Sequence, residues 1–261
     1  MAYRIIIVFI YLAILSCSEP FGIIDKNHNA TIDEECIAYK IDSSLIVQDG
    51  NIQYLIAGPT NHEKFNISDS DIDLCKLNQG LGREYFPALY EPQYDPIEKF
   101  SYDDGMECIV VNDGKIKKIF PYCVLSQHET INETVNGEAV MVVYCELAKL
   151  AAVYKRTYCD KTLTFAPSGY TYFDNDYWNG VQGILMWDRE SESLWWPLND
   201  KCLSGSMQGT TIAKASFQVW EYMTWGEIKK QYPHSISVSH EQEIEIPTNL
   251  PSYSLEDISC P

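Results

Sequence analysis

The pattern of apolar and polar positions changes near residue 107. Residues 18–82 are polar, acidic and irregular, with short strand-like pieces only at residues 37–41, 45–47 and 52–57. Farther along, residues 139–145 are continuously apolar, which is typical of a strand buried on both faces. Shorter apolar runs predict further strands at residues 150–154, 162–165, 184–187, 194–196 and 218–222.

Turn and cap signals predict one hairpin and two short helices. Asn112-Asp113-Gly114 separates two apolar runs, and an Asp-Gly pair readily takes the positive φ of a hairpin turn. Pro121 can start a helix whose core-facing residues recur at helical spacing: Val124, Leu125, His128 and Ile131. A capping box at residues 224–227 predicts a second helix over residues 225–232, which Pro233 ends. Together these elements predict a single β-rich α+β domain with mostly antiparallel strands.

The first residues have the pattern of an export signal. Residues 5–15 are apolar, follow a single positive charge and are too few to span a bilayer. Ile14-Leu15-Ser16-Cys17 resembles a lipobox, in which Cys17 becomes the lipidated first residue of the mature chain. The alternative is an ordinary signal peptide that is cleaved near Ser16 or Ser18. We expect an exported cell-envelope lipoprotein, anchored to the membrane by lipid at Cys17.

The predicted organisation has four parts. A signal peptide with its lipobox covers residues 1–17, and an N-terminal extension with a peripheral subdomain covers residues 18–84. The core domain covers residues 85–240, and a C-terminal tail covers residues 241–261. With 261 residues, of which 46% are hydrophobic, the chain is long enough to bury a sizeable core.

Charge and cysteine content narrow the function. Nineteen Lys and Arg against 37 Asp and Glu give a net charge of −18, which repels phosphate backbones, so we expect no nucleic-acid partner. Export would place the cysteines other than Cys17 where disulfides persist. Their number permits complete pairing, but no spacing selects a connectivity. These residues are Cys36, Cys75, Cys108, Cys123, Cys145, Cys159, Cys202 and Cys260.

The strongest candidate site combines Cys145, His128 and Glu129. A buried strand that ends in Cys145, beside a helix that presents His128, can bring a thiol and an imidazole together. One interpretation is a catalytic pair, with Cys145 as nucleophile or redox thiol, His128 as base and Glu129 as its orienter. The other is a metal site with Cys145 and His128 as ligands. The structural alternative is a buried or disulfide-bonded Cys145 and a core His128.

A second candidate group is Ser168, Asp188, Arg189 and Trp195. Ser168-Gly169 is expected to form a tight turn before an aromatic loop, where it can line a cavity. A serine-hydrolase elbow is disfavoured, since Ala166 stands where that motif has Gly. Asp188 and Arg189 either brace a β-turn or line a ligand pocket with Trp195. Trp195 and Trp196 are adjacent on a predicted strand, so we expect one in the core and the other more exposed.

The chain resembles a bacterial family known as domain of unknown function 3179. The resemblance rests on His128-Glu129, Tyr144-Cys145, Ser168-Gly169 and the Asp188-Arg189 segment that ends in Leu194-Trp195, and it runs from about residue 86 to 239. It implies that the His-Glu pair and the Cys after Tyr are hallmark residues. In the family the strand typically ends Tyr-Cys-Pro-Leu-Cys, whereas this chain has Ala148 at the last position. A redox pair of two thiols therefore cannot form there.

These observations rank three functions. The first is a binding module that holds a metal ion or small ligand near Cys145 and His128. The second is a thiol-dependent enzyme that uses Cys145. The third is a structural envelope protein without a site. The missing second thiol argues against a dithiol enzyme, which places the binding module first.

Overall fold

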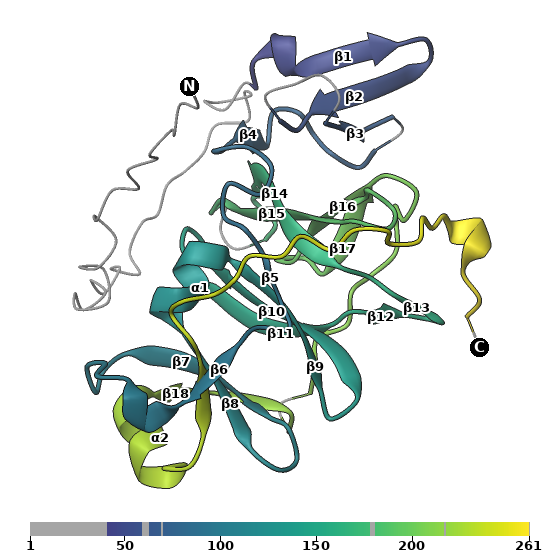
Figure 1. The fold of residues 1–261 in the computed structure, drawn as a ribbon. Helices are drawn as coiled ribbons and strands as arrows, with labels where there is room; N and C mark the ends of the chain where they lie inside the picture. The colour runs from purple at the N-terminus through teal and green to yellow at the C-terminus, as the bar shows by residue number, and fades with distance from the viewer. Residues whose placement is uncertain (1–40, 59–62, 69, 178–180, 217, 261) are drawn as a thin grey trace, which may run out of the picture.

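The structure is a computed structural model that describes residues 41–58, 63–68, 70–177, 181–216 and 218–260 (Figure 1). The predicted signal peptide, Cys17 and most of the predicted strand at residues 37–41 lie outside the described residues. No helix in the described part of the chain is long and apolar enough to cross a membrane.

The described strands form four stacked sheets and a two-stranded ribbon (Figure 1). Sheet A contains β1 (Ile46–Asp49), β2 (Ile52–Ile56) and β3 (Lys64–Asn66). Sheet B has the order β17 (Lys201–Ser204), β16 (Leu194–Trp196), β15 (Gly183–Asp188), β14 (Phe165–Tyr172) and β4 (Leu77–Gln79). Sheet C has the order β11 (Leu150–Lys155), β10 (Glu138–Cys145), β9 (Thr130–Val135) and β5 (Leu89–Tyr90).

Sheet D has the order β18 (Trp220–Thr224), β7 (Glu107–Asn112), β8 (Lys117–Pro121), β19 (Ile236–Val238) and β6 (Tyr94–Pro96). The ribbon pairs β12 (Thr157–Tyr158) with β13 (Lys161–Thr162). Pairing is antiparallel except between β5 and β9 and between β8 and β19. The helices are α1 (Tyr122–His128), α2 (Trp225–Gln231) and the 3-10 turns Ser43–Leu45, Ile97–Lys99 and Leu255–Asp257. The predicted β-rich, mostly antiparallel fold is confirmed.

Sheet C separates two hydrophobic cores. Along β10, Met141, Val143 and Cys145 belong to the core that sheet C shares with sheet B. Val140, Val142 and Tyr144 alternate with them and belong to the core shared with sheet D. An antiparallel strand normally has one solvated face, so burial of both faces explains why β10 is continuously apolar.

The first core also reaches sheet A. Leu55 and Phe65 of that sheet are fully buried, and the Phe65 ring lies 5.9 Å from the Trp187 ring of β15. Strand β4, from the predicted N-terminal extension, pairs with β14 at the edge of sheet B. The extension therefore shares the main core.

The local predictions agree well with the structure. The hairpin of β7 and β8, helix α1 after Pro121, and strand β10 lie where the sequence places them. Helix α2 has the predicted capping box, formed by Thr224 and Glu227, and ends just before Tyr232. The predicted strand at residues 162–165 is wrong in extent. Strand β14 starts at Phe165 and continues to Tyr172, through the region predicted to be a turn and loop.

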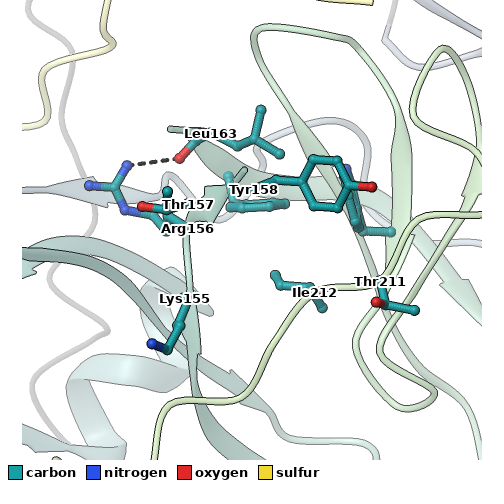
Figure 2. Close-up of a pocket in the computed structure, with 9 residues that line it drawn as sticks. Lys155, Arg156, Thr157, Tyr158, Leu163, Thr211 and Ile212 are labelled. Carbon is teal, nitrogen blue, oxygen red and sulfur yellow. Dashed lines mark hydrogen bonds between the residues drawn. The ribbon is translucent and has the colours of Figure 1, made fainter. Parts of the chain in front are cut away.

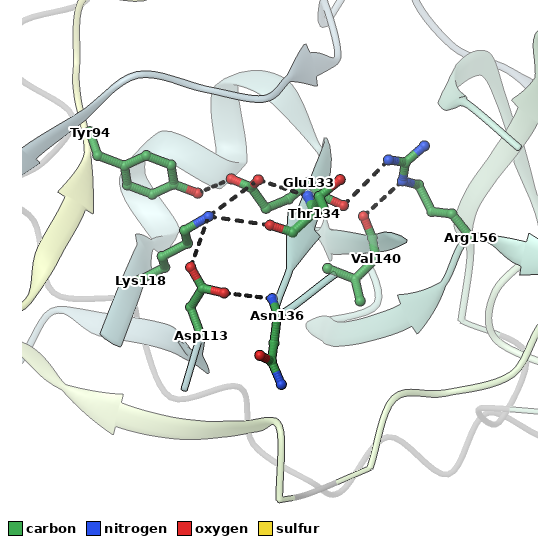
Figure 3. Close-up of polar contacts among 8 residues, drawn as sticks. All are labelled: Tyr94, Asp113, Lys118, Glu133, Thr134, Asn136, Val140 and Arg156. Atoms are coloured by element: carbon green, nitrogen blue, oxygen red, sulfur yellow. Dashed lines mark hydrogen bonds and ion pairs between the residues drawn. The ribbon is translucent and has the colours of Figure 1, made fainter. Parts of the chain in front are cut away.

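A buried polar network links sheet C to sheet D (Figure 3). Glu133 of β9 points into the second core, accepts a hydrogen bond from the Tyr94 hydroxyl and pairs with Lys118 of β8 at 3.3 Å. Lys118 also lies 3.6 Å from Asp113. Each of these buried charged groups has a partner of opposite charge. The network therefore stabilises the packing of sheet C against sheet D.

Cysteine pairing is partial in the structure. Cys159 and Cys260 form a disulfide that ties the C-terminal tail to the ribbon of β12 and β13. Three other cysteines are buried free thiols: Cys108, Cys145 and Cys202. The tail also bonds to the body through Tyr253, whose N–H donates to the Glu190 carbonyl at 2.9 Å.

Candidate functional site

A backbone hydrogen bond at Glu129 joins the end of helix α1 to the end of strand β10. The helix ends because Glu129 takes a positive φ of 56°, and the chain then turns directly into β9. The Glu129 carbonyl accepts a hydrogen bond from the Tyr144 N–H at 2.9 Å. Glu129, which follows His128, is therefore bonded to the residue before Cys145.

Cys145 is a buried, unpaired thiol that is surrounded by backbone donors. Its Sγ accepts a hydrogen bond from the Ile184 N–H at 3.3 Å. Burial raises the pKa of the thiol, whereas the N–H groups of Ala148, Ile184 and Leu147 lower it and the Glu129 charge raises it. The resting group is the neutral thiol, yet its surroundings contain donors that stabilise negative charge on sulfur.

His128 has one ring nitrogen fixed and one available. Its Nδ1 lies 2.7 Å from the Pro87 carbonyl oxygen, which can only accept, so Nδ1 carries the proton. Nε2 then has the lone pair of a base or a metal ligand. Burial lowers the pKa of His128, so the ring is neutral near pH 7. Pro87 supplies the orienting contact that the sequence analysis assigned to Glu129.

Glu129 is half-buried and has an ionisable carboxyl group. Burial raises its pKa to about 7, and no donor or cation of the described residues bonds to its carboxyl oxygens. A positive φ in a residue other than Gly stores backbone strain of about 1–3 kcal/mol. Strain and a pKa near neutrality are both features of functional positions.

Asp188 braces the turn between β15 and β16. It is fully buried and accepts hydrogen bonds from the Ser191 N–H at 2.7 Å, the Ser191 hydroxyl at 2.6 Å and Trp195 Nε1 at 2.7 Å. Burial raises the pKa of this carboxyl group and the hydrogen bonds lower it. Its oxygens are thus occupied within the protein.

Arg189 connects the same turn to β5 and to the chain before it. Its Nε donates to the Tyr90 hydroxyl at 2.8 Å, and its guanidinium forms an ion pair with Glu84. Asp188 and Arg189 form no ion pair with each other among the described residues, since each has other partners. Both side chains hold the turn in place.

Ser168 and Gly169 form a bulge inside β14, so the predicted turn before an aromatic loop is wrong. The fully buried Ser168 hydroxyl donates to the Leu185 carbonyl and accepts from the Tyr170 N–H at 3.2 Å. Gly169 has a φ of 83°, and a Cβ there would lie 2.1 Å from the Gly82 carbonyl carbon. A glycine at this position lets the chain before β5 cross the strand.

The expectation that one of two adjacent tryptophans is exposed is also wrong. Trp195 and Trp196 are each 1% exposed. Trp195 packs edge-on against Phe165, and Trp196 packs edge-on against Tyr172. The two indoles do have different neighbours, but both faces of β16 are covered, so neither ring is an exposed stacking surface.

A small cavity lies at the far end of the β10–β11 hairpin from Cys145 (Figure 2). Lys155, Arg156, Leu163 and Trp195 are among its lining residues, and its volume of about 10 Å³ suits a single water molecule. Lys155 pairs with Val140, five residues before Cys145 on β10. The cavity is therefore separate from the thiol and too small for an organic ligand.

Residues 80–88 have no role predicted from the sequence, yet this loop positions three of the candidate residues. It supplies the Pro87 carbonyl to His128 and the Glu84 carboxylate to Arg189, and Gly82 packs on Gly169. The only local signal was its Gly and Pro content, which indicates a loop and not its contacts.

The profile of a family described as protein of unknown function (DUF3179) matches residues 83–246, more than half of the chain. The chain belongs to the DUF3179 family. The match begins at Arg83 and includes every candidate residue from His128 to Trp195. No curated protein and no solved structure is significantly similar to this DUF3179 chain. Among the described residues, no group of three or more His, Cys, Asp or Glu side chains forms a metal site.

Proposed function

We propose that this DUF3179 protein is a binding module that takes one soft metal ion between Cys145 and His128. The observation that carries the proposal is the fixed tautomer of His128. Histidine ligands characteristically donate their second ring N–H to a carbonyl or carboxylate, which leaves the other nitrogen to bind the metal. The Pro87 carbonyl has this role, and Glu129 connects His128 to the end of β10.

The ligand types favour Cu(I) over other ions. Thiolate sulfur selects soft metals, and imidazole is compatible with them. Zn²⁺ usually takes four ligands, whereas Cu(I) is stable with two, and the proposed site consists of two, Cys145 and His128. The Ile184, Leu147 and Ala148 N–H groups would stabilise the thiolate once the metal displaces the proton.

The test is anaerobic titration of the folded protein with Cu(I) against a competing chelator. We expect one equivalent to bind to the wild type, and Cys145→Ala to lose that binding. Cys202→Ala is the matched control, because Cys202 is also a buried free thiol. Equal binding by wild type and Cys145→Ala, or no binding by either, would reject the site.

The pKa of Glu129 favours a thiol-dependent enzyme as the second candidate. A carboxyl group with a pKa of about 7 near a thiol can accept its proton at neutral pH. Cys145 would then react with iodoacetamide faster than Cys108, whose pKa burial raises strongly, and Glu129→Gln would slow the reaction of Cys145. An unreactive Cys145 in protein that also binds no metal would leave a structural role.

We further propose that the protein is exported and anchored by lipid at Cys17. The disulfide between Cys159 and Cys260 supports an oxidising compartment. Intact-mass analysis of membrane fractions should find a chain that begins at acylated Cys17, and Cys17→Ser should prevent acylation. An unmodified chain that begins after Cys17 would indicate plain secretion.

A further inference from the structure

Three arginines lie in the described part of the chain, and one of them has no hydrogen-bond acceptor. Arg156 donates to three backbone carbonyls, those of Val140, Leu163 and Glu133. Arg189 donates to the Tyr90 hydroxyl and pairs with Glu84. The Arg83 guanidinium makes no hydrogen bond to any described residue, although its side chain is only 15% exposed.

Arg83 is held in place by aromatic rings. Its guanidinium carbon lies 3.4 Å from the centre of the Trp187 ring and 5.3 Å from the centre of the Phe65 ring. Its backbone N–H donates to the Ala57 carbonyl at 2.9 Å, and the chain beside it packs on Gly169. The guanidinium charge therefore lies on the Trp187 ring, and no described residue accepts a hydrogen bond from its five N–H donors.

The nearest carboxylate is that of Glu192, in the turn between β15 and β16. Its Oε1 lies 3.9 Å from an Arg83 terminal nitrogen, which is too long for a hydrogen bond. The Glu192 side chain is 61% exposed, so it can swing into solvent. A mostly buried cation whose N–H donors have no acceptors destabilises the folded state unless another group accepts their hydrogen bonds.

We propose that Arg83 forms a subsite for a small oxyanion, a carboxylate or a phosphate group, and that Glu192 occupies its approach until the ligand displaces it. A guanidinium matches either oxyanion with two parallel hydrogen bonds. The net charge of −18 and the nearby carboxylates of Glu84 and Glu63 oppose large polyanions, so a single anionic group fits best. The subsite uses none of the residues of the proposed metal site and does not depend on it.

The test is the thermal unfolding midpoint of the full protein in phosphate, acetate or chloride at constant ionic strength. Binding to the folded state raises the midpoint with ligand concentration, which yields a dissociation constant. We expect phosphate or acetate to raise the wild-type midpoint above the chloride value. The anion that acts identifies the ligand group as a phosphate or a carboxylate.

Glu192→Gln removes the competing carboxylate at an exposed position, so folding should be unaffected. The exposed ion pair between Arg83 and Glu192 contributes little free energy, so its removal should strengthen anion binding only modestly. We expect the dissociation constant of the anion to be about two- to fivefold lower for Glu192→Gln than for Glu243→Gln. Glu243→Gln is the matched control, because it removes the same charge from an exposed tail residue. Arg83→Gln should abolish the response and Arg83→Lys should weaken it.

Two results would overturn the subsite. One is a thermal unfolding midpoint in phosphate and acetate equal to that in chloride, for both the wild type and Glu192→Gln. The other is an unchanged anion response in folded Arg83→Gln. If Arg83→Gln does not fold, equal dissociation constants for Glu192→Gln and Glu243→Gln would reject the displacement by themselves.

Discussion

At the scale of single residues, Glu129 makes stability depend on pH. Its pKa of about 7 exceeds the ordinary value of 4.5, so between these values the folded state keeps a proton that the unfolded state has lost. This stabilisation is complete below about pH 4.5 and is lost as pH rises through 7, a change of about 2–3 kcal/mol. Glu129→Gln should remove it, as urea unfolding across pH 4 to 8 would reveal. If the free energy of unfolding changed with pH in the same way for the wild type and Glu129→Gln, the raised pKa of Glu129 would be contradicted.

Asp188 offers a second test at the residue scale. Asp188→Asn keeps the shape but places an amide NH₂ where the carboxylate accepts from Ser191 and Trp195. At least one buried donor then loses its acceptor, so the free energy of unfolding should fall by about 2–3 kcal/mol. Denaturant titration measures the loss, and Glu192→Gln, in the same turn but exposed, is the control. An unchanged midpoint would mean that the turn does not need the carboxylate.

At the scale of elements, the network around Glu133 joins sheet C to sheet D. Glu133→Ala removes the closest carboxylate from the partly buried Lys118, which keeps Asp113 at 3.6 Å, and should lower the free energy of unfolding by about 1–3 kcal/mol (Figure 3). The double variant Glu133→Leu with Lys118→Met should recover most of that loss, because it removes both charges and fills the space. Denaturant unfolding of the single and double variants measures both effects. Additive losses would show that the two charges do not act as a pair.

At the scale of the whole molecule, the disulfide between Cys159 and Cys260 closes a loop of 101 residues. Closure of so long a loop restricts the unfolded chain, and such a bond contributes about 3–4 kcal/mol. The double variant Cys159→Ser with Cys260→Ser should therefore unfold at a clearly lower temperature. A reducing agent should lower the midpoint of the wild type by more than that of the variant, in which Cys75 is still disulfide-bonded. Equal unfolding midpoints of the wild type and the double variant in oxidising buffer would show that the disulfide does not stabilise the folded protein.

The sequence by itself determined the elements whose signals are local. An Asp-Gly turn predicts the β7–β8 hairpin, Pro121 starts α1, and the capping box of Thr224 and Glu227 starts α2, because each signal acts over a few residues. The uninterrupted apolar run predicts β10 and its burial on both faces. The positions of His128 at the end of α1 and of Cys145 at the end of β10 were also predictable from the order of the elements.

Only the tertiary structure decided what each candidate side chain touches. The Pro87 carbonyl that orients His128 is 41 residues away in the chain, and Ser168 lies in a bulge because the chain near Gly82 crosses it. Trp195 and Trp196 are both buried because layers cover both faces of β16. Among the arginines that the structure describes, Arg156 and Arg189 donate to acceptors and Arg83 does not, a difference that only the folded structure reveals. Contacts between distant segments depend on how sheets stack, and a local pattern contains no record of that stacking.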